Sequence, residues 1–101
     1  MIIDKNFKIK FRLLCENEQE WIDIQYHLFD IGYYWAQGKV LQNSYWKFPA
    51  IIKNYRTPDE FGGRNLIQAD YNLFKSIYPN KNIDKVSIYL RKVKMKKINS
   101  L

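Results

Sequence analysis

Apolar side chains recur every three or four residues between positions 17 and 31, which is the spacing of one face of an α-helix. The positions that define this stripe are Trp21, Ile24, Leu28 and Ile31. Asn17 can cap the first turn, with Glu20 three residues later as the second member of a capping box. Gly32 follows where a left-handed residue commonly ends a helix. The pattern therefore predicts a helix over residues 17–31 with a broad buried face.

Residues 7–14 alternate between apolar and polar side chains, which predicts a strand with one buried and one exposed face. The exposed face carries the basic residues Lys8, Lys10 and Arg12. Basic side chains can solvate the outer face of a sheet or protect its edge, and they can also bind phosphate. The pattern by itself favours the first interpretation and leaves the second as an alternative.

Shorter elements follow the long helix. Strands are predicted at residues 33–35, 40–48, 50–55, 66–70 and 83–90, with the main loop at residues 56–65. Asp70 can cap a short helix over residues 71–78, in which Leu73, Phe74 and Ile77 are spaced to pack inward. Together these elements predict an α+β fold: a small, mainly antiparallel sheet with one long amphipathic helix packed on one face and a second short helix.

The chain has the length of one domain, and its 47% hydrophobic and 17% aromatic content is too high for a disordered chain. Residues 1–91 are predicted to form a single compact domain, and residues 92–101 a basic C-terminal tail. No apolar run is long enough to span a bilayer, and the first residues lack the apolar segment of a signal peptide. A cytoplasmic location in a bacterial host cell is therefore expected, without a membrane partner.

Charge is unevenly distributed along the chain. Residues 16–30 carry five carboxylates and no lysine or arginine, although the net charge is +7. The long helix therefore offers a partner an acidic face, formed by Glu20, Asp23 and Asp30. The candidate contacts for an anion or a nucleic acid lie elsewhere in the sequence: Lys8, Lys10, Arg12, Arg64, Arg91, Lys92 and Lys94.

The chain offers few groups for catalysis or metal binding. His27 is its only histidine and Cys15 its only cysteine, so an internal disulfide is excluded, and their spacing does not support a nucleophilic pair. Cys15 is expected to be a small buried side chain at the end of a strand. Asp23, His27 and Asp30 have a helical spacing compatible with a metal, but a solvated acidic face is the better interpretation. We expect no enzymatic activity, no metal and no cofactor.

The predicted main loop and the aromatic residues also bear on binding. Gly62 and Gly63 could cradle an anion with Arg64 as its donor, but no P-loop sequence follows, and a flexible turn is favoured.

Aromatic residues next to cations can stack on bases while the cations contact phosphates. Those on or beside predicted strands are Tyr33, Tyr34, Trp35, Tyr45, Trp46, Phe48, Tyr55 and Tyr71. Most of them, including Trp35, Trp46 and Phe48, are expected in the core, which leaves one or two exposed.

One pattern resembles that of a known group of proteins. It comprises Leu28-Phe29, then Gly32-Tyr33, Trp35 and Gly38, and later the run Phe74-Lys75-Ser76-Ile77-Tyr78-Pro79-Asn80-Lys81. It resembles a signature found in small uncharacterised proteins of bacteriophages and other mobile elements in low-GC bacteria. The resemblance implies a phage setting and an α+β fold, and it transfers no catalytic residue. The run from Phe48 to Ile52 falls outside that pattern.

These observations favour a non-enzymatic phage or mobile-element protein that inhibits host defence machinery, in the manner of anti-CRISPR or anti-restriction proteins. The expected partner is a host protein or nucleoprotein complex, contacted through the acidic helix face or the basic surface. The alternative is direct binding of RNA, DNA or a nucleotide second messenger through a basic, aromatic-containing sheet face. An enzyme ranks well below both.

Overall fold

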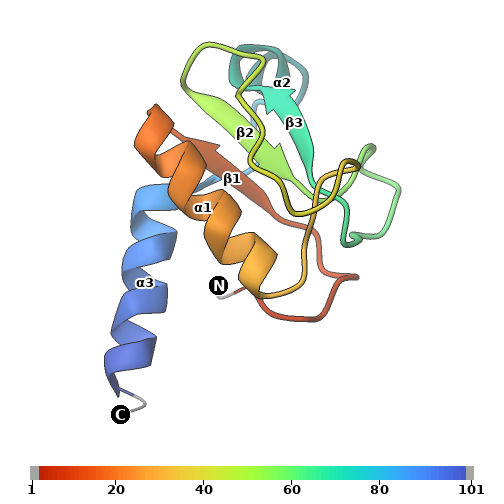
Figure 1. The fold of residues 1–101 in the computed structure, drawn as a ribbon. Helices are drawn as coiled ribbons and strands as arrows, with labels where there is room; N and C mark the ends of the chain where they lie inside the picture. Colours follow the sequence, from red (N-terminus) through yellow and green to blue (C-terminus); the bar gives the residue numbers. More distant parts are fainter. Residues whose placement is uncertain (1–2, 100–101) are drawn as a thin grey trace.

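A computed structural model of the protein describes the backbone of residues 3–99 and the side chains of residues 3–96. The elements follow one another as β1 (Arg12–Cys15), α1 (Glu18–Asp30), β2 (Ala50–Lys53), β3 (Ile67–Asp70), α2 (Tyr71–Ile77), β4 (Asp84–Lys85) and α3 (Val86–Asn99). Figure 1 shows α1 lying across the sheet with α3 beside it. None of the helices in the described part of the chain has the length and apolar character needed to cross a membrane.

The four strands form one mixed sheet in the order β3-β2-β1-β4. β1 pairs with β2, and β2 with β3, in antiparallel fashion, whereas β4 pairs with β1 in parallel. The predicted α+β class is therefore confirmed. The sheet is antiparallel except at its edge strand β4, which is only two residues long.

Both faces of the sheet are covered, which explains the unbroken apolar runs in its two central strands. Leu13 and Ile52 pair across β1 and β2, and they belong to the core that α1 and α3 cover. Leu14 and Ile51, the next pair, belong to a second cluster with Phe74 of α2. Strands that are buried on both faces lose the alternation of apolar and polar residues.

The predicted long helix is confirmed, including both of its ends. The Asn17 side chain accepts a hydrogen bond from the Glu20 amide at 2.9 Å, as a capping residue does. The Glu20 carboxylate accepts in turn from the Glu16 amide at 2.9 Å, one residue earlier than in a standard capping box. Gly32 has a φ of 105°, which is the left-handed conformation expected after the last turn.

The predicted strand at residues 7–14 is wrong in its first half, because β1 begins only at Arg12. The preceding residues form a turn in which side chains bind the backbone. The Asp4 carboxylate accepts from the Asn6 amide at 2.8 Å, and the Asn6 side chain accepts from the Lys8 amide at 3.3 Å. Such local bonds compete with strand pairing. As a result, Ile9 is exposed instead of buried.

The predicted strands at residues 33–35 and 40–48 are also wrong. Tyr34 and Trp35 make only isolated bridges, to Asn65 and Gly38. Residues 40–48 are irregular, and both backbone polar groups of Gln42 are bound by side chains of α1 instead of a neighbouring strand.

The short helix α2 is capped by Asp70 as predicted, since its side chain accepts from the Asn72 amide at 3.2 Å. Phe74 is buried, but Leu73 and Ile77 are exposed, against the prediction that all three pack inward. A helix of seven residues covers the sheet mainly through one side chain.

The largest error concerns residues 83–90, which were predicted as the last strand and instead contain β4 and the start of α3. Val86 and Tyr89 are buried, and Val93 packs against the same core. This spacing of three and four residues is helical. Ser87 and Leu90 are compatible with a strand as well as with a helix. The predicted boundary between residues 91 and 92 falls inside α3. Residues 1–2 of the predicted domain and residues 100–101 of the predicted tail lie outside the described residues.

Candidate functional site

A basic group surrounds the ring of Tyr55, just after β2. Lys53 Nζ lies 4.9 Å from the centre of this ring, Lys10 Nζ 5.1 Å and Arg12 Cζ 5.8 Å. Arg12 also donates a hydrogen bond to the Tyr55 hydroxyl at 2.9 Å. Lys81 lines the same small hollow as Lys10, Arg12 and Tyr55. We call these five residues the Tyr55 cluster.

Three of the four cations of the Tyr55 cluster are fixed by backbone carbonyls. Arg12 Nε donates to the Asn82 carbonyl at 2.9 Å, Lys53 Nζ to the Arg56 carbonyl at 3.3 Å, and Lys10 Nζ to the Pro58 carbonyl. Within residues 3–96, no carboxylate forms an ion pair with Lys10, Arg12 or Lys53. The cluster therefore presents concentrated positive charge.

The pKa of Lys53 is lowered by its surroundings. Partial burial lowers the pKa of this ammonium below its ordinary value of 10.5, and the neighbouring Arg12 charge lowers it further. The Glu60 carboxylate acts in the opposite direction but does not restore it. Burial and the repulsion between Arg12 and Lys53 thus disfavour the charged form of Lys53 in the folded state.

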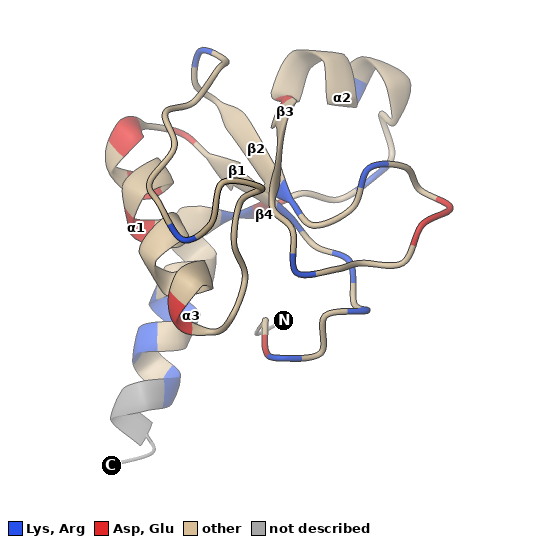
Figure 2. Ribbon diagram, turned by 45° about the vertical axis from the view of Figure 1, so that its right-hand side comes forward, with Lys and Arg blue, Asp and Glu red and all other residues tan. Residues whose placement is uncertain are grey.

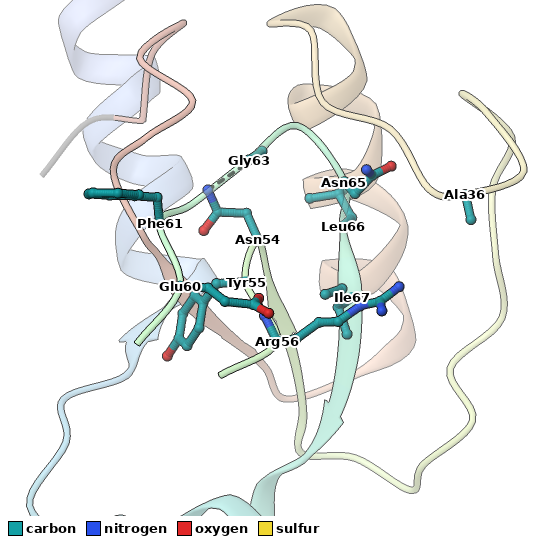
Figure 3. A pocket seen from close by; sticks show the side chains of 10 residues that line it. All are labelled: Ala36, Asn54, Tyr55, Arg56, Glu60, Phe61, Gly63, Asn65, Leu66 and Ile67. Carbon is teal, nitrogen blue, oxygen red and sulfur yellow. Dashed lines mark hydrogen bonds between the residues drawn. The ribbon is translucent and has the colours of Figure 1, made fainter. Parts of the chain in front are cut away.

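Tyr55 also lines a larger hollow of about 380 Å³, shown in Figure 3. Its wall includes Arg56, Glu60, Phe61 and Asn65. Glu60 accepts a hydrogen bond from the Arg56 amide at 3.1 Å. The ring of Phe61 points away from the other labelled side chains in Figure 3, and 82% of its surface is exposed.

The buried side chain of Asn54 holds the backbone around this hollow. Its oxygen accepts from the Phe11 amide at 2.8 Å, and its nitrogen donates to the Ile9 carbonyl at 2.9 Å and the Gly63 carbonyl at 3.1 Å. A Cβ atom at Gly62 would lie 2.6 Å from the Ile9 carbonyl oxygen. Gly62 therefore permits a close approach of two backbone segments, which is more specific than the flexible turn favoured from the sequence.

The seven basic residues predicted from the sequence do not form one surface. Lys10 and Arg12 join the Tyr55 cluster. Lys8 is exposed on the preceding turn, and the guanidinium of Arg64 lies 4.2 Å from the centre of the Phe7 ring. Figure 2 shows a separate basic stretch along α3, where three predicted residues are exposed: Arg91, Lys92 and Lys94.

Lys53 and Lys81 are not among the seven basic residues predicted from the sequence. Lys53 reaches it because β1 and β2 pair in a register that places Arg12 opposite Lys53. The spacing of residues along the chain does not reveal such a register.

A second exposed surface is formed by residues 40–48, which we call the Trp46 loop. Its large side chains include Tyr45, which is 72% exposed, and Trp46, which is 43% exposed. The predicted core position of Trp46 is therefore wrong, whereas Trp35 is buried and Phe48 packs against the core. A hollow of about 360 Å³ lies between part of this loop and α1, and the residues lining it include Ile22 and Trp46.

The Trp46 loop is irregular but firmly bound. The buried Gln25 side chain accepts from the Gln42 amide at 2.8 Å and the Trp35 indole at 2.8 Å, and donates to the Gln42 carbonyl at 3.2 Å. The Trp21 indole donates to that same carbonyl at 2.7 Å. Gln68 of β3 accepts from the Tyr45 amide at 2.8 Å. These bonds replace the strand pairing that the loop lacks.

The three predicted acidic residues of α1 differ in exposure. Asp23 and Asp30 are exposed, and Asp23 accepts from the Gln19 side chain at 2.8 Å. Glu20 is half-buried and bound to the helix start. His27, which was predicted on the same face, instead lies toward α3 with its Nε2 2.9 Å from the Tyr89 hydroxyl. The exposed acidic face therefore rests on Asp23 and Asp30.

Cys15 ends β1 and is fully buried, which confirms its interpretation as a structural side chain. Burial, with a smaller contribution from Glu20, raises the pKa of its thiol and keeps it protonated. Within the described residues, no three histidine, cysteine, aspartate or glutamate side chains are grouped to hold a metal.

Comparison with protein family models, with curated proteins and with solved structures found no match for this chain. The resemblance to small phage proteins therefore stays a prediction.

Proposed function

We propose that this protein is a non-enzymatic inhibitor from a phage or mobile element, which binds a protein of the host defence machinery through the Trp46 loop and the adjoining side of α1. The observation that carries this proposal is the exposure of Tyr45 and Trp46 on a firmly bound segment. Tyrosine and tryptophan dominate the binding energy of protein interfaces. A segment that is already ordered loses little conformational freedom on binding.

Charge indicates the kind of partner. Glu18 and Lys47 line the hollow beside Trp46, and Asp23 and Asp30 are exposed elsewhere on α1, so the acidic character comes from the helix. A partner with an apolar pocket and a basic rim complements this surface. Host proteins that handle nucleic acids have such basic surfaces, so an acidic helix can compete for them.

The test is a pull-down from host lysate after nuclease treatment, with the protein and two variants immobilised in parallel. We expect a specific host protein to bind the parent chain and to be lost with Trp46→Ala. The matched control is Phe61→Ala, which also removes an exposed aromatic ring but lies outside the Trp46 loop.

Retention of the same host protein by Trp46→Ala would contradict the proposed surface. If no host protein survives nuclease treatment, the inhibitor proposal itself fails, because its contact is with a protein and not with nucleic acid.

A further inference from the structure

We infer that the Tyr55 cluster, together with the hollow beside it, is a binding site for single-stranded nucleic acid. This inference goes beyond the proposed inhibitor function and does not depend on the Trp46 loop. It rests on the juxtaposition of fixed cations and an exposed aromatic ring on neighbouring parts of one surface.

The cations supply the phosphate contacts. Lys10, Arg12 and Lys53 lie within 5.8 Å of one ring centre and have no ion-paired carboxylate among residues 3–96. A phosphate that approaches this surface offsets the repulsion between Arg12 and Lys53, because an anion near like charges turns an unfavourable field into a favourable one. Lys81 on the rim of the same hollow adds a further contact.

Phe61 supplies the base contact, because Tyr55 is only 5% exposed. Tyr55 is shared by both hollows, and Phe61 lines the larger one with most of its ring exposed. A strand that crosses Tyr55 can place its phosphates on the cluster and stack a base on Phe61. The larger hollow also offers the Asn65 side chain as a hydrogen-bonding group for base edges.

The geometry favours a single strand over a duplex. The bases of a duplex are stacked on each other and cannot reach an aromatic ring, whereas unpaired bases can. Arg12 and Lys53 are half-buried, so the phosphates must approach closely, which a flexible single strand can do.

The experiment measures binding of fluorescently labelled oligonucleotides to the full chain by anisotropy at several salt concentrations. The probes are a 12-nucleotide single-stranded DNA, the RNA of the same sequence and the corresponding DNA duplex. We expect both single strands to bind more tightly than the duplex. Phe61→Ala should weaken single-strand binding about tenfold, as for loss of one stacked base.

Lys81→Ala tests the cations with little risk to folding, because this side chain is exposed. We expect weaker single-strand binding and a salt dependence reduced by about 0.7 in the slope of log K against log salt, the value for one lost phosphate contact. Lys10→Ala should act in the same direction, provided that its unfolding temperature matches the parent chain.

Two matched controls complete the design. Lys92→Ala removes the same charge from α3, and Tyr45→Ala removes an exposed aromatic ring from the Trp46 loop. Neither should change the affinity by more than about twofold.

Equal losses for Lys92→Ala and Lys81→Ala would overturn the proposed site in favour of diffuse polyanion binding. Equal affinity for duplex and single strand, an unchanged affinity in Phe61→Ala, or no binding of any probe would overturn it as well. None of these results bears on the host-protein contact, which the Trp46→Ala pull-down tests separately.

Discussion

The Trp46 loop is irregular backbone, whereas the Tyr55 cluster lies where β1 and β2 meet irregular segments, and in each region one buried side-chain amide holds the irregular backbone in place. Gln25 binds both backbone polar groups of Gln42 in the first region. Asn54 joins Ile9, Phe11 and Gly63 in the second.

The two surfaces differ in chemistry and in their effect on stability. The Trp46 loop exposes aromatic rings, and the hollow beside it is lined by one carboxylate, Glu18, and one cation, Lys47. The Tyr55 cluster crowds cations, one of which has a lowered pKa. The same kind of buried amide therefore supports two surfaces of different chemistry, and a cation with a lowered pKa lies on the basic one.

The largest effect is expected for Asn54→Ala. This change leaves the buried Phe11 amide and the carbonyls of Ile9 and Gly63 without their partner, so the free energy of unfolding should fall by about 4 kcal/mol. Urea unfolding measures this loss, with Asn65→Ala, an exposed amide, as its control. A loss below about 1 kcal/mol would show that Asn54 does not hold this region.

A smaller effect is expected for Gln25→Ala, because the Gln42 carbonyl keeps its bond from the Trp21 indole. We expect a loss of about 2 to 3 kcal/mol and faster amide hydrogen exchange at Gln42. Exchange at Gly63 should follow only the global change in stability. Gln19→Ala on the exposed side of the same helix is the control. An equal increase in amide hydrogen exchange at Gln42 and Gly63 would show that the two regions are not held separately.

Removing a charge from the Tyr55 cluster should stabilise the fold. The pKa of Lys53 is lowered in the folded state, so between that value and 10.5 the unfolded chain binds more protons, and stability rises with pH. Lys53→Met removes this dependence and should raise the free energy of unfolding by less than about 1 kcal/mol, since the group is partly exposed. It should also weaken single-strand binding. A destabilised Lys53→Met with unchanged pH dependence would show that the cations do not oppose folding.

The smallest effect on stability is expected for Trp46→Ala. The side chain is already partly exposed, so the free energy of unfolding should change by no more than about 0.5 kcal/mol. Trp35→Ala, which empties a buried site, should cost about 4 kcal/mol. Thermal unfolding of the two variants separates an exposed contact residue from a core residue. A large loss in Trp46→Ala would mean that this ring is structural and would remove the basis of the proposed inhibitor surface.

The sequence predicts the parts of the fold that depend on neighbouring residues. Helix α1, its Asn17 cap and the Gly32 end are of this kind, and so are β2 and the Asp70 cap of α2. The structure differs from the prediction where contacts between residues distant in the sequence determine the backbone conformation. Gln42 is bound by Gln25, 17 residues away, and this bond rules out the predicted strand.

Helix α3 illustrates a different limit. Its sequence places apolar residues at positions 86, 88 and 90, which alternate as in a strand, and at positions 86, 89 and 93, which recur as in a helix. Burial of Tyr89 against the core and exposure of Ile88 favour the helix. Neither can be known before the residues that pack against α3 are known.

The candidate site could be predicted only in part for the same reason. Lys10 and Arg12 were identified from one strand, whereas Lys53 joins them through the pairing of Arg12 with Lys53. Asn54 gives no local signal and Gly62 signals only a turn, because their roles require contact with residues 9–11.

The most direct test of two separate surfaces is an amide NMR titration of the full chain with the 12-nucleotide single-stranded DNA. We predict chemical-shift changes at Tyr55, Phe61 and Gly63, with no change at Tyr45 or Trp46. Changes concentrated along α3 at Arg91 to Lys94, or shared equally by the Trp46 loop, would contradict the account.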